Sequence, residues 1–419
     1  RALRSAAAER AHDIRAVVTR SPDIVLALRP VLVASPLVVP ATLPDSLRID
    51  LVVVTHAHRV STAACVAALS HAPQALVVGD HLRGGPQIFS YAGQKPEGTE
   101  PANVRGEGPS LLEEASAILG VRTLSTHYRA LSQRMIGPVA AATTAPVESF
   151  PGVWGASSVA RRVVPKAESL VATATSAAVD LLLRGRTASL AIVTDAPQRA
   201  EAIQQALRVA AAENALVREA LYAGRSTGLV CVPLARWAGD VRDHAMWVRE
   251  PGHEPSAAEV ITALSATRRT LTVVDTADDG VPEDSEVGQM LEALLAPEDQ
   301  GARSVNEDHP LMQDLTSRLT AEGFTVRRGV GSGRYAVPLA IEHPDRPGRL
   351  MVGIDVDLEP SPSPIGRDSV RLRSDQLTRV GWTPMRVLGT NLFRDPAREV
   401  AAIVSTVQQA SRDARGSGS

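Results

Sequence analysis

The feature that most constrains the fold is a pair of short apolar runs, each followed by a polar turn. Residues 51–54 read L-V-V-V and lead into T-H-A-H, while residues 75–78 read A-L-V-V and lead into G-D-H. The intervening residues 61–70 are rich in alanine and predict a helix. Strand, helix and strand at this spacing are typical of a parallel βαβ unit. We therefore expect an α/β domain with both polar turns at the carboxyl edge of its sheet.

Strands and helices continue to alternate along the rest of the chain. Upstream, residues 1–20 predict a helix that ends at Ser21-Pro22, and the apolar segments 24–28 and 31–34 are consistent with buried strand and loop. A helix is expected at 110–119. The second block predicts strands at 189–194, 228–232 and 271–275 and helices at 196–213 and 257–265. The third predicts helices at 311–322, 369–380 and 396–409 and strands at 325–330, 336–341, 350–356 and 383–388.

Length and charge limit the classes of protein that the chain can represent. Its 419 residues, 44% of them hydrophobic, are too many for one ordinary core and predict two or three domains. The net charge of −2 gives no global indication of nucleic acid or of an acidic membrane. Lys95 and Lys166 are the only lysines. The excess of arginine is explained most simply by GC-rich codons, and otherwise by bidentate contacts to phosphate.

The two cysteines and the chain ends add expectations about location. Cys65 and Cys231 lie far apart in apolar surroundings, which predicts neither a disulfide nor a thiolate metal site and fits a cytoplasmic protein. The apolar region 24–39 is interrupted by arginine and proline, so no membrane span or membrane partner is expected. The chain opens on arginine without a signal peptide and is expected to be a fragment or a processed piece. Residues 412–419 are expected to form a flexible tail.

The segment 270–302 has nine acidic residues and no basic one. We interpret it as a solvated linker with a helix, and its charge disfavours contact with nucleic acid. An acidic surface for a protein partner is the alternative.

Several segments, in the same order along the chain, resemble motifs of large bacterial superfamily 1 DNA helicases of actinobacterial type. The two strand–turn segments resemble motifs II and III, which end in D-E-A-S and G-D-x-x-Q-L-P-P, and residues 21–43 resemble the segment before motif II. Residues 124–136, L-S-T-H-Y-R-A-L-S-Q-R-M-I, are similar to the L-x-x-H-Y-R-S motif. Residues 189–207 match the opening of the second RecA-like domain. Residues 236–243 and 263–274 resemble motifs V and VI.

The C-terminal block resembles a small restriction-endonuclease-like domain related to Vsr and PD-(D/E)xK nucleases, on residues 329–341, 352–358, 367–373 and 381–386. Together the resemblances imply an α/β chain with parts of two RecA-like parallel-sheet domains followed by a small nuclease-like domain. The implied domains are 1–136, the second half of a first RecA-like domain without its P-loop half; 137–300, the second RecA-like domain with the acidic linker; and 301–411, the nuclease-like domain.

The helicase resemblance places other residues where hydrolysis needs acids and phosphate sensors. Thr55 and His56 replace the motif II carboxylates that hold Mg²⁺ and activate water, and hydroxyl and imidazole are poor Mg²⁺ ligands. Arg83 replaces the glutamine of motif III. In motifs V and VI, Ala238 replaces the glutamine and Ala266 the arginine that would reach the γ-phosphate. His56 and His58 could bind a transition metal from one strand face, but the sequence offers no third ligand, and we predict no metal site.

Three residues remain as candidates for the nucleotide cleft: Asp80, Arg129 and Arg268. Arg129 would be an arginine finger in an active relative. The interpretation that we favour for it is a salt bridge or a helix cap. Asp80, beside a glycine in a strand-end turn, is equally typical of a cap.

The nuclease-like block departs from its family in a similar way. The metal-binding aspartate of the first catalytic strand is replaced by Pro338. Asp355 and Asp357 alternate along the next strand and should share one face, where they could hold a metal weakly. Arg367, Arg371 and Arg373 are candidate nucleic-acid-binding residues, with solvated arginines as the alternative.

The sequence therefore favours a non-catalytic helicase-like and nuclease-like scaffold, associated with DNA or RNA or with other protein subunits. Neither ATP nor Mg²⁺ is expected as a cofactor, because the groups that would hold them are replaced. One alternative is a fragment of an active ATP-dependent helicase–nuclease. Another is a protein-interaction module that touches no nucleic acid.

Overall fold

The computed structural model describes residues 14–86, 109–127, 129–143, 147–153, 159–166, 169–185, 189–223, 228–237, 240–276, 285–295, 309–358 and 366–416. The chain divides into two compact units, Arg1–Arg122 and Thr123–Ser419. The predicted boundary between the first two domains lies at 136, so residues 123–136 belong to the second unit. None of the described helices is long and apolar enough to cross a lipid bilayer.

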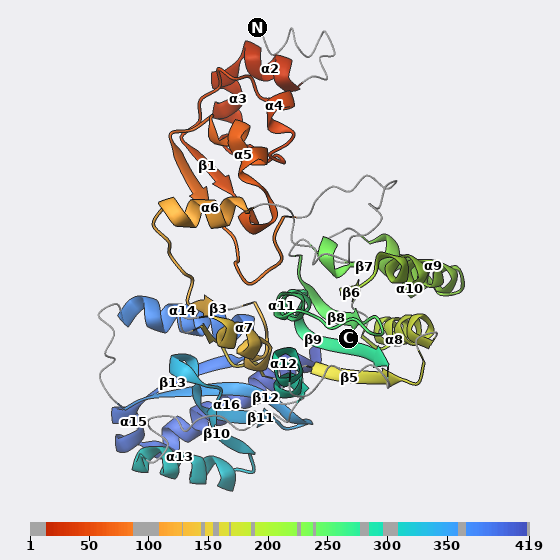
Figure 1. Ribbon diagram of the computed structural model, residues 1–419. Helices are drawn as coiled ribbons and strands as arrows, with labels where there is room; N and C mark the ends of the chain where they lie inside the picture. The colour runs from red at the N-terminus through yellow and green to blue at the C-terminus, as the bar shows by residue number, and fades with distance from the viewer. Residues whose placement is uncertain are drawn as a thin grey trace. The chain divides into compact units, whose positions relative to one another are not determined.

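The first unit is built on the predicted βαβ segment (Figure 1). Strands β1 (Leu51–Val54) and β2 (Gln74–Val77) pair in parallel, and α5 (Thr62–Leu69) connects them. The other elements are α2 (Ile14–Arg20), α3 (Pro22–Leu28), α4 (Val39–Thr42), the 3-10 turn η1 (Ala57–Arg59) and α6 (Leu111–Ile118). Ser61 caps α5, and Ser110 caps α6 in a capping box with Glu113. The predictions of these two helices and two strands are confirmed.

The interpretation of 24–34 as buried strand and loop is wrong. Residues Pro22–Leu28 form helix α3, and no residue of this helix is buried. Ser21 occupies the N-cap and Pro22 the first turn, a pairing that favours a helix start over a strand. Val31 and Val33, in the following loop, are 75% and 94% exposed.

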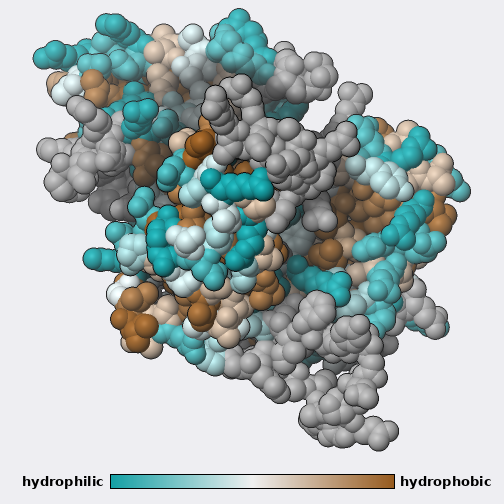
Figure 2. Space-filling view, turned by 90° about the horizontal axis from the view of Figure 1, so that it is seen from above, coloured by the Kyte–Doolittle hydropathy of each residue, from teal (hydrophilic) through white to brown (hydrophobic). Residues whose placement is uncertain are grey.

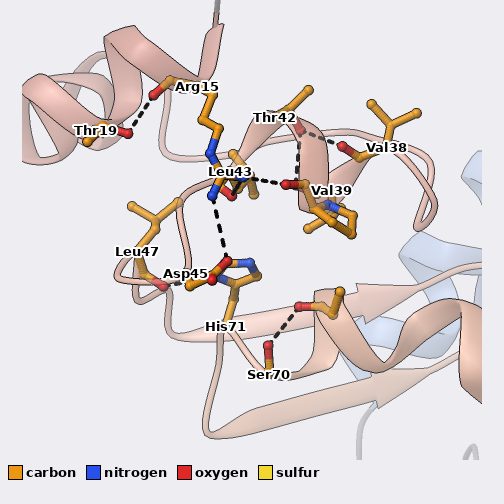
Figure 3. A network of polar contacts seen from close by, with 12 residues as sticks. Arg15, Thr19, Val38, Val39, Thr42, Leu43, Asp45, Leu47, Ser70 and His71 are labelled. Atoms are coloured by element: carbon orange, nitrogen blue, oxygen red, sulfur yellow. Dashed lines mark hydrogen bonds and ion pairs between the residues drawn. The ribbon is translucent and has the colours of Figure 1, made fainter.

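A polar network joins the N-terminal helix to the sheet region (Figure 3). Arg15, on α2, donates to the carbonyl oxygens of Pro40 and Leu43, the latter at 2.9 Å, and lies 3.9 Å from Asp45. His71 Nδ1 lies 2.9 Å from the Leu47 carbonyl oxygen. These contacts satisfy carbonyl groups at and beyond the end of α4, where the chain has no regular structure to pair them.

Helices cover one face of the β1–β2 sheet, and the described side chains of the other face are largely exposed. Val54 packs with Leu111, Leu112 and Cys65 of the covering helices. The residues that alternate with the covered set, Leu51, Val53, Leu76 and Val78, are 42–51% exposed. More generally, Figure 2 shows hydrophobic residues exposed among hydrophilic ones on the face of the molecule that it draws. Parallel sheets are usually covered on both faces, whereas the described helices of this unit cover one.

The second unit begins with a five-stranded, all-parallel sheet of order β5-β9-β8-β6-β7. Its strands are β5 (Val159–Val164), β6 (Leu190–Thr194), β7 (Leu229–Pro233), β8 (Arg242–Val248) and β9 (Thr267–Thr276). Helices α8 (Ser169–Gly185), α9 (Pro197–Glu213) and α10 (Ala215–Tyr222) cover one face. Helices α11 (Ala257–Ser265) and α12 (Glu286–Leu295) cover the other, together with the 3-10 turn η2 (Gln133–Ile136) and helix α7 (Gly137–Ala142).

The acidic segment is less solvated than predicted. Val287 and Leu294 of α12 are buried in the core, and Asp275 is 3% exposed within β9. Residues 277–284 and 296–302 of that segment lie outside the described residues.

The C-terminal block is a four-stranded mixed sheet of order β10-β11-β12-β13. Strands β10 (Val326–Val330), β11 (Val337–His343) and β12 (Arg346–Asp357) are antiparallel neighbours, and β13 (Thr383–Leu388) runs parallel to β12. The 3-10 turn η4 (Gly333–Tyr335) precedes β11. Helices α13 (Pro310–Ala321), α15 (Gly389–Arg394) and α16 (Pro396–Gly416) cover one face, and α14 (Gly366–Arg379) packs on the other. The helix predicted to end at 409 continues to Gly416, through part of the predicted tail.

A segment from far upstream completes this domain, and we call residues 147–153 the strap. Phe150, 1% exposed, stacks on Tyr335 with ring centroids 4.1 Å apart. Trp382 donates its ring N–H to the Pro151 carbonyl oxygen at 2.7 Å, and the Leu350 amide donates to the Val153 carbonyl oxygen at 2.7 Å. The strap and α14 therefore share the coverage of one face of the C-terminal sheet.

Glycines make room for the strap. Gly331 has φ +86°, and a Cβ there would lie 2.7 Å from Pro151. Gly381 has φ +102°, and a Cβ there would lie 3.1 Å from Val153. Another residue at either position would strain the backbone, and at Gly331 it would also clash with Pro151.

Candidate functional site

The carboxyl ends of β1 and β2 bring the remnants of motifs II and III together. Thr55 and His56 are exposed directly after β1, and His56 has the left-handed backbone angles φ 53° and ψ 36°. A non-glycine residue in this region is strained by about 1–2 kcal/mol. Asp80 and Arg83 follow β2 and pair with each other, with Arg83 Nε 3.3 Å from Asp80 Oδ2.

The centre of this edge is His58, which is 4% exposed. Its Nδ1 accepts a hydrogen bond from the Asp80 amide at 3.1 Å, and its ring lies 6.0 Å from that of His56. Burial and, secondly, the positive charge of Arg83 lower the pKa of His58 to about 4. His58 is therefore neutral at pH 7 and joins the two strand-end turns as a hydrogen-bond acceptor.

The carboxylate of Asp80 is engaged within its own turn. Asp80 Oδ1 accepts from the Leu82 amide at 3.0 Å and its other oxygen faces Arg83. Mg²⁺ is usually held by one or two carboxylates together with waters and phosphate oxygens, and Asp80 is the one carboxylate in the turns 55–58 and 79–86. Nowhere in the described part of the chain do three His, Cys, Asp or Glu side chains gather in a way that could hold a metal ion.

The motif V and VI positions lie in the second unit. Arg268 Nη2 lies 3.1 Å from Asp243, and the Arg268 carbonyl oxygen accepts from the Leu131 amide at 2.7 Å. Ala266 is fully buried and its carbonyl oxygen accepts from the Arg242 amide. Arg129 is exposed, and Ala238 lies outside the described residues. Asp80 belongs to the first unit and Arg129 and Arg268 to the second, so the predicted nucleotide cleft remains a prediction.

The carboxyl edge of the five-stranded sheet holds a polar network that the sequence analysis did not single out. Asp195, directly after β6, accepts from the Trp247 ring N–H at 2.7 Å and from the Glu250 amide at 3.0 Å. Burial raises the pKa of Asp195 despite these bonds. Arg199 binds both carboxylate oxygens of Glu250, at 2.6 and 2.8 Å.

A second group at this edge surrounds a buried carboxylate. Asp275 accepts from Arg249 at 2.9 Å and from Arg161 at 2.8 Å. Open α/β sheets usually bind ligands between strands such as β6 and β8, whose connections leave in opposite directions. Here side chains that follow β6 and β8 bond to one another at that position. Two sequence signals could have indicated this network. Asp195 directly follows one apolar strand, and Arg249 and Glu250 directly follow another.

In the C-terminal sheet, Asp355 and Asp357 lie on the face of α14, as their alternation predicts. Each is paired with an arginine. Arg373 of α14 lies 3.6 Å from Asp355, and Arg386 of β13 lies 2.7 Å from Asp357. Arg373 also donates to the Ala336 carbonyl oxygen at 2.7 Å. The register Leu339↔Ile354 sets Pro338 opposite Asp355, so the neighbouring strand adds no carboxylate there.

The other predicted arginines of this domain are less engaged. Arg371 is 84% exposed and lies 3.9 Å from Asp375. Arg367 lies in α14, but its side chain is outside the described residues. Arg386 was not predicted as a site residue, because its place beside Asp355 depends on the pairing of β12 with β13.

Comparison with known proteins supports the assignment of this block. The REase_MTES_1575 family, which is restriction-endonuclease-like, matches residues 312–407. The C-terminal block is therefore similar to a restriction-endonuclease-like domain over residues 312–407. The match covers the sheet and helices from α13 to most of α16 and leaves the strap outside.

Other comparisons are weaker. A search of curated proteins found no match. Two solved structures of the PRRSV helicase are similar to 53% and 60% of this chain, at 11% and 10% identity and TM-scores of 0.29 and 0.21. The matched regions span 34% and 39% of those helicases. Likeness at this level carries no inference about function. The α/β class with a parallel sheet and a C-terminal mixed sheet is confirmed by the strand pairing itself.

Proposed function

We propose that the chain is a non-catalytic, nucleic-acid-associated scaffold that keeps helicase-like and nuclease-like folds, with the carboxylates of the candidate sites either replaced or paired with arginine. The restriction-endonuclease-like domain points to a function related to nucleic acids. The observation that carries the non-catalytic part is the pairing of Asp355 with Arg373 and of Asp357 with Arg386. Two guanidinium groups occupy the place in which a divalent cation would have to bind.

The electrostatics oppose a metal at this position. Cleavage of a phosphodiester with metal ions needs carboxylates that are free to coordinate them. A cation at Asp355 and Asp357 would have to displace or repel both arginines, and Pro338 offers no replacement ligand. The same arginines can contact a phosphate, so the pairing is compatible with binding while it disfavours cleavage.

The strand ends of the first unit support the same proposal. Hydrolysis of ATP by helicase-like domains uses motif II acids, and Thr55 and His56 stand in their place. The buried neutral His58 makes this turn a packed structural element. We therefore propose that neither ATP nor Mg²⁺ is a cofactor of this chain.

The test uses the full chain with duplex and single-stranded oligonucleotides. We expect binding that weakens as salt is raised, with no cleavage and no ATP turnover in Mg²⁺ or Mn²⁺. Mg²⁺-dependent ATP turnover that an Arg129→Ala substitution abolishes would support an active helicase instead. Absence of binding to either oligonucleotide at low salt would favour a protein-interaction module.

A further inference from the structure

Arg373, whose side chain pairs with Asp355, is held between two elements that the strap contacts. Its Nε lies 3.6 Å from Asp355 Oδ2, and its Nη2 donates to the Ala336 carbonyl oxygen at 2.7 Å. Ala336 directly follows the 3-10 turn η4, whereas Arg373 itself belongs to α14. The Arg373 side chain is 19% exposed, so it reaches Asp355 from a largely covered position. The place of this guanidinium group therefore depends on where η4 and α14 lie.

The strap and Gln133 together fix both ends of η4. Phe150 stacks on Tyr335, the last residue of this turn, with ring centroids 4.1 Å apart and 28° between the ring planes. The side-chain amide of Gln133 accepts from the amide of Ser332, the N-cap of η4, at 2.8 Å and donates to its carbonyl oxygen at 3.2 Å. The same side chain donates to the Ser149 carbonyl oxygen of the strap at 2.6 Å. The acceptor of the Arg373 bond is thus anchored from upstream in the chain.

The strap also fixes the end of α14. Trp382, three residues beyond this helix, donates its ring N–H to the Pro151 carbonyl oxygen at 2.7 Å. Leu377 of α14 packs in the same apolar cluster as Phe150 and Val153. The helix that carries the donor and the turn that precedes the acceptor therefore rest on one short segment.

Contacts continue from this segment to the five-stranded sheet. The Leu131 amide donates to the carbonyl oxygen of Arg268, at the start of β9, at 2.7 Å. Gly152 of the strap lies so close to Leu131 that a Cβ at this glycine would clash with the Leu131 carbonyl oxygen. The start of β9, the strap and η4 are consequently joined by direct contacts within one compact unit.

We propose that the strap is an intramolecular positioning device: seated on η4 and α14, it holds Arg373 against Asp355, and its displacement releases this pair. A hydrogen bond of 2.7 Å tolerates little movement of its acceptor, and close-packed side chains shift together rather than stretch apart. The charge presented at Asp355 would then depend on contacts made by the five-stranded sheet. This inference rests on the proposed function and adds regulation to the same site.

The test measures in the full chain whether Arg373 stays docked. The readout is the exchange of its Nε hydrogen with water in ¹⁵N NMR spectra, assigned with an Arg373→Lys variant. Gln133→Ala removes the clamp on η4 and should speed this exchange at least about fivefold, the effect of one lost hydrogen bond. Phe150→Leu removes the ring stack but keeps an apolar side chain, so it should act in the same direction without preventing folding.

Two controls separate displacement of Arg373 from general loosening of the domain. Arg327 Nε donates to Glu342 at 2.6 Å in the same sheet without touching the strap, so its exchange should stay within about twofold in both variants. Phe393→Ala, which removes a ring that is 78% exposed on α15, should leave the exchange at Arg373 unchanged.

Unchanged exchange at Arg373 in both Gln133→Ala and Phe150→Leu would overturn this inference and leave the proposed function standing. Equal acceleration at Arg373 and Arg327 would also overturn it, because the strap would then only stabilise the domain. The proposed function fails by a different result, namely cleavage of an oligonucleotide by the unmodified chain.

Discussion

The edge of the β1–β2 sheet and the strand pair β12–β13 hold their polar groups in different ways. At the first, a buried neutral histidine joins the two turns. At the second, arginines pair with two aspartates. The histidine is part of a packed core, whereas the ion pairs are partly exposed and charged. The first edge should therefore respond to changes in packing and pH, and the second to changes in its ion pairs.

The largest expected effect is the pH dependence of the first unit. Because the pKa of His58 falls from 6.5 to about 4 on folding, its contribution to stability is complete above pH 6.5 and is lost as the pH falls through about 4. A shift of this size corresponds to at most about 3 kcal/mol. Hydrogen exchange at the Ala57 and Val78 amides, which form the bonds between the turns and strands, measures it.

A His58→Asn variant is the control for that experiment, since its amide can accept the Asp80 bond but does not titrate. Its exchange should vary less between pH 6.5 and 4 than that of the unmodified chain. Equal pH dependence in the two proteins would show that another group is responsible.

The next effect tests the packing of the same edge. A Cβ at Gly79 would lie 2.7 Å from Leu112 Cδ2 and 3.1 Å from the His58 amide nitrogen. Gly79→Ala should therefore destabilise the first unit by about 1–3 kcal/mol. Gly120→Ala, with nothing within 4 Å of the added atom, is the control. Thermal unfolding would show the difference, and equal melting of both variants would contradict a tightly packed turn.

A smaller effect is expected at β12–β13. Arg386→Ala frees Asp357 from a half-exposed pair and should change stability by less than about 1 kcal/mol. It should strengthen Mn²⁺ binding, measured calorimetrically, because the repelling charge is gone. Unchanged Mn²⁺ binding in both Arg386→Ala and Arg373→Ala would mean that the arginines are not what excludes a cation.

The smallest effect is expected on the exposed side of α14. Arg371→Ala breaks a 3.9 Å ion pair at a highly exposed position and should alter stability by less than about 0.5 kcal/mol. Chemical denaturation measures this change. A larger effect would show that Arg371 interacts with groups beyond its partner Asp375.

Much of the fold could be predicted where the sequence pattern is local. Helix α11 lies at the predicted bounds, and the parallel pairing of β1 with β2 follows from a short apolar run, a helix and a second run. Strand β5 was missed because it carries Arg161 and Arg162, and β8 because it opens with Arg242, Asp243 and His244. Both strands pair with apolar strands of the sheet, and these contacts stabilise them despite their charged residues. Intrinsic strand propensity does not account for such tertiary contacts.

The candidate sites likewise divide into features that a local sequence pattern predicts and features that depend on tertiary contacts. The shared face of Asp355 and Asp357 follows from alternation along a strand, so the sequence was sufficient. The pairing of Asp357 with Arg386 depends on a register between strands that are separated by helix α14. Asp195 and its bonds to residues 247 and 250 likewise depend on which strands are neighbours. Such partners depend on the order of the strands in the sheet. This order cannot be deduced from the spacing of residues along the chain.

The strap has a consequence for how this chain can be divided in the laboratory. Since Phe150, Pro151 and Val153 complete one face of the C-terminal sheet, the C-terminal domain is discontinuous in sequence, and the five-stranded sheet lies between the strap and the rest of that domain along the chain. A fragment that begins at the family match would lack the strap and expose the rings of Tyr335 and Trp382. The shortest fragment that keeps this face covered therefore begins before residue 147 and includes both sheets.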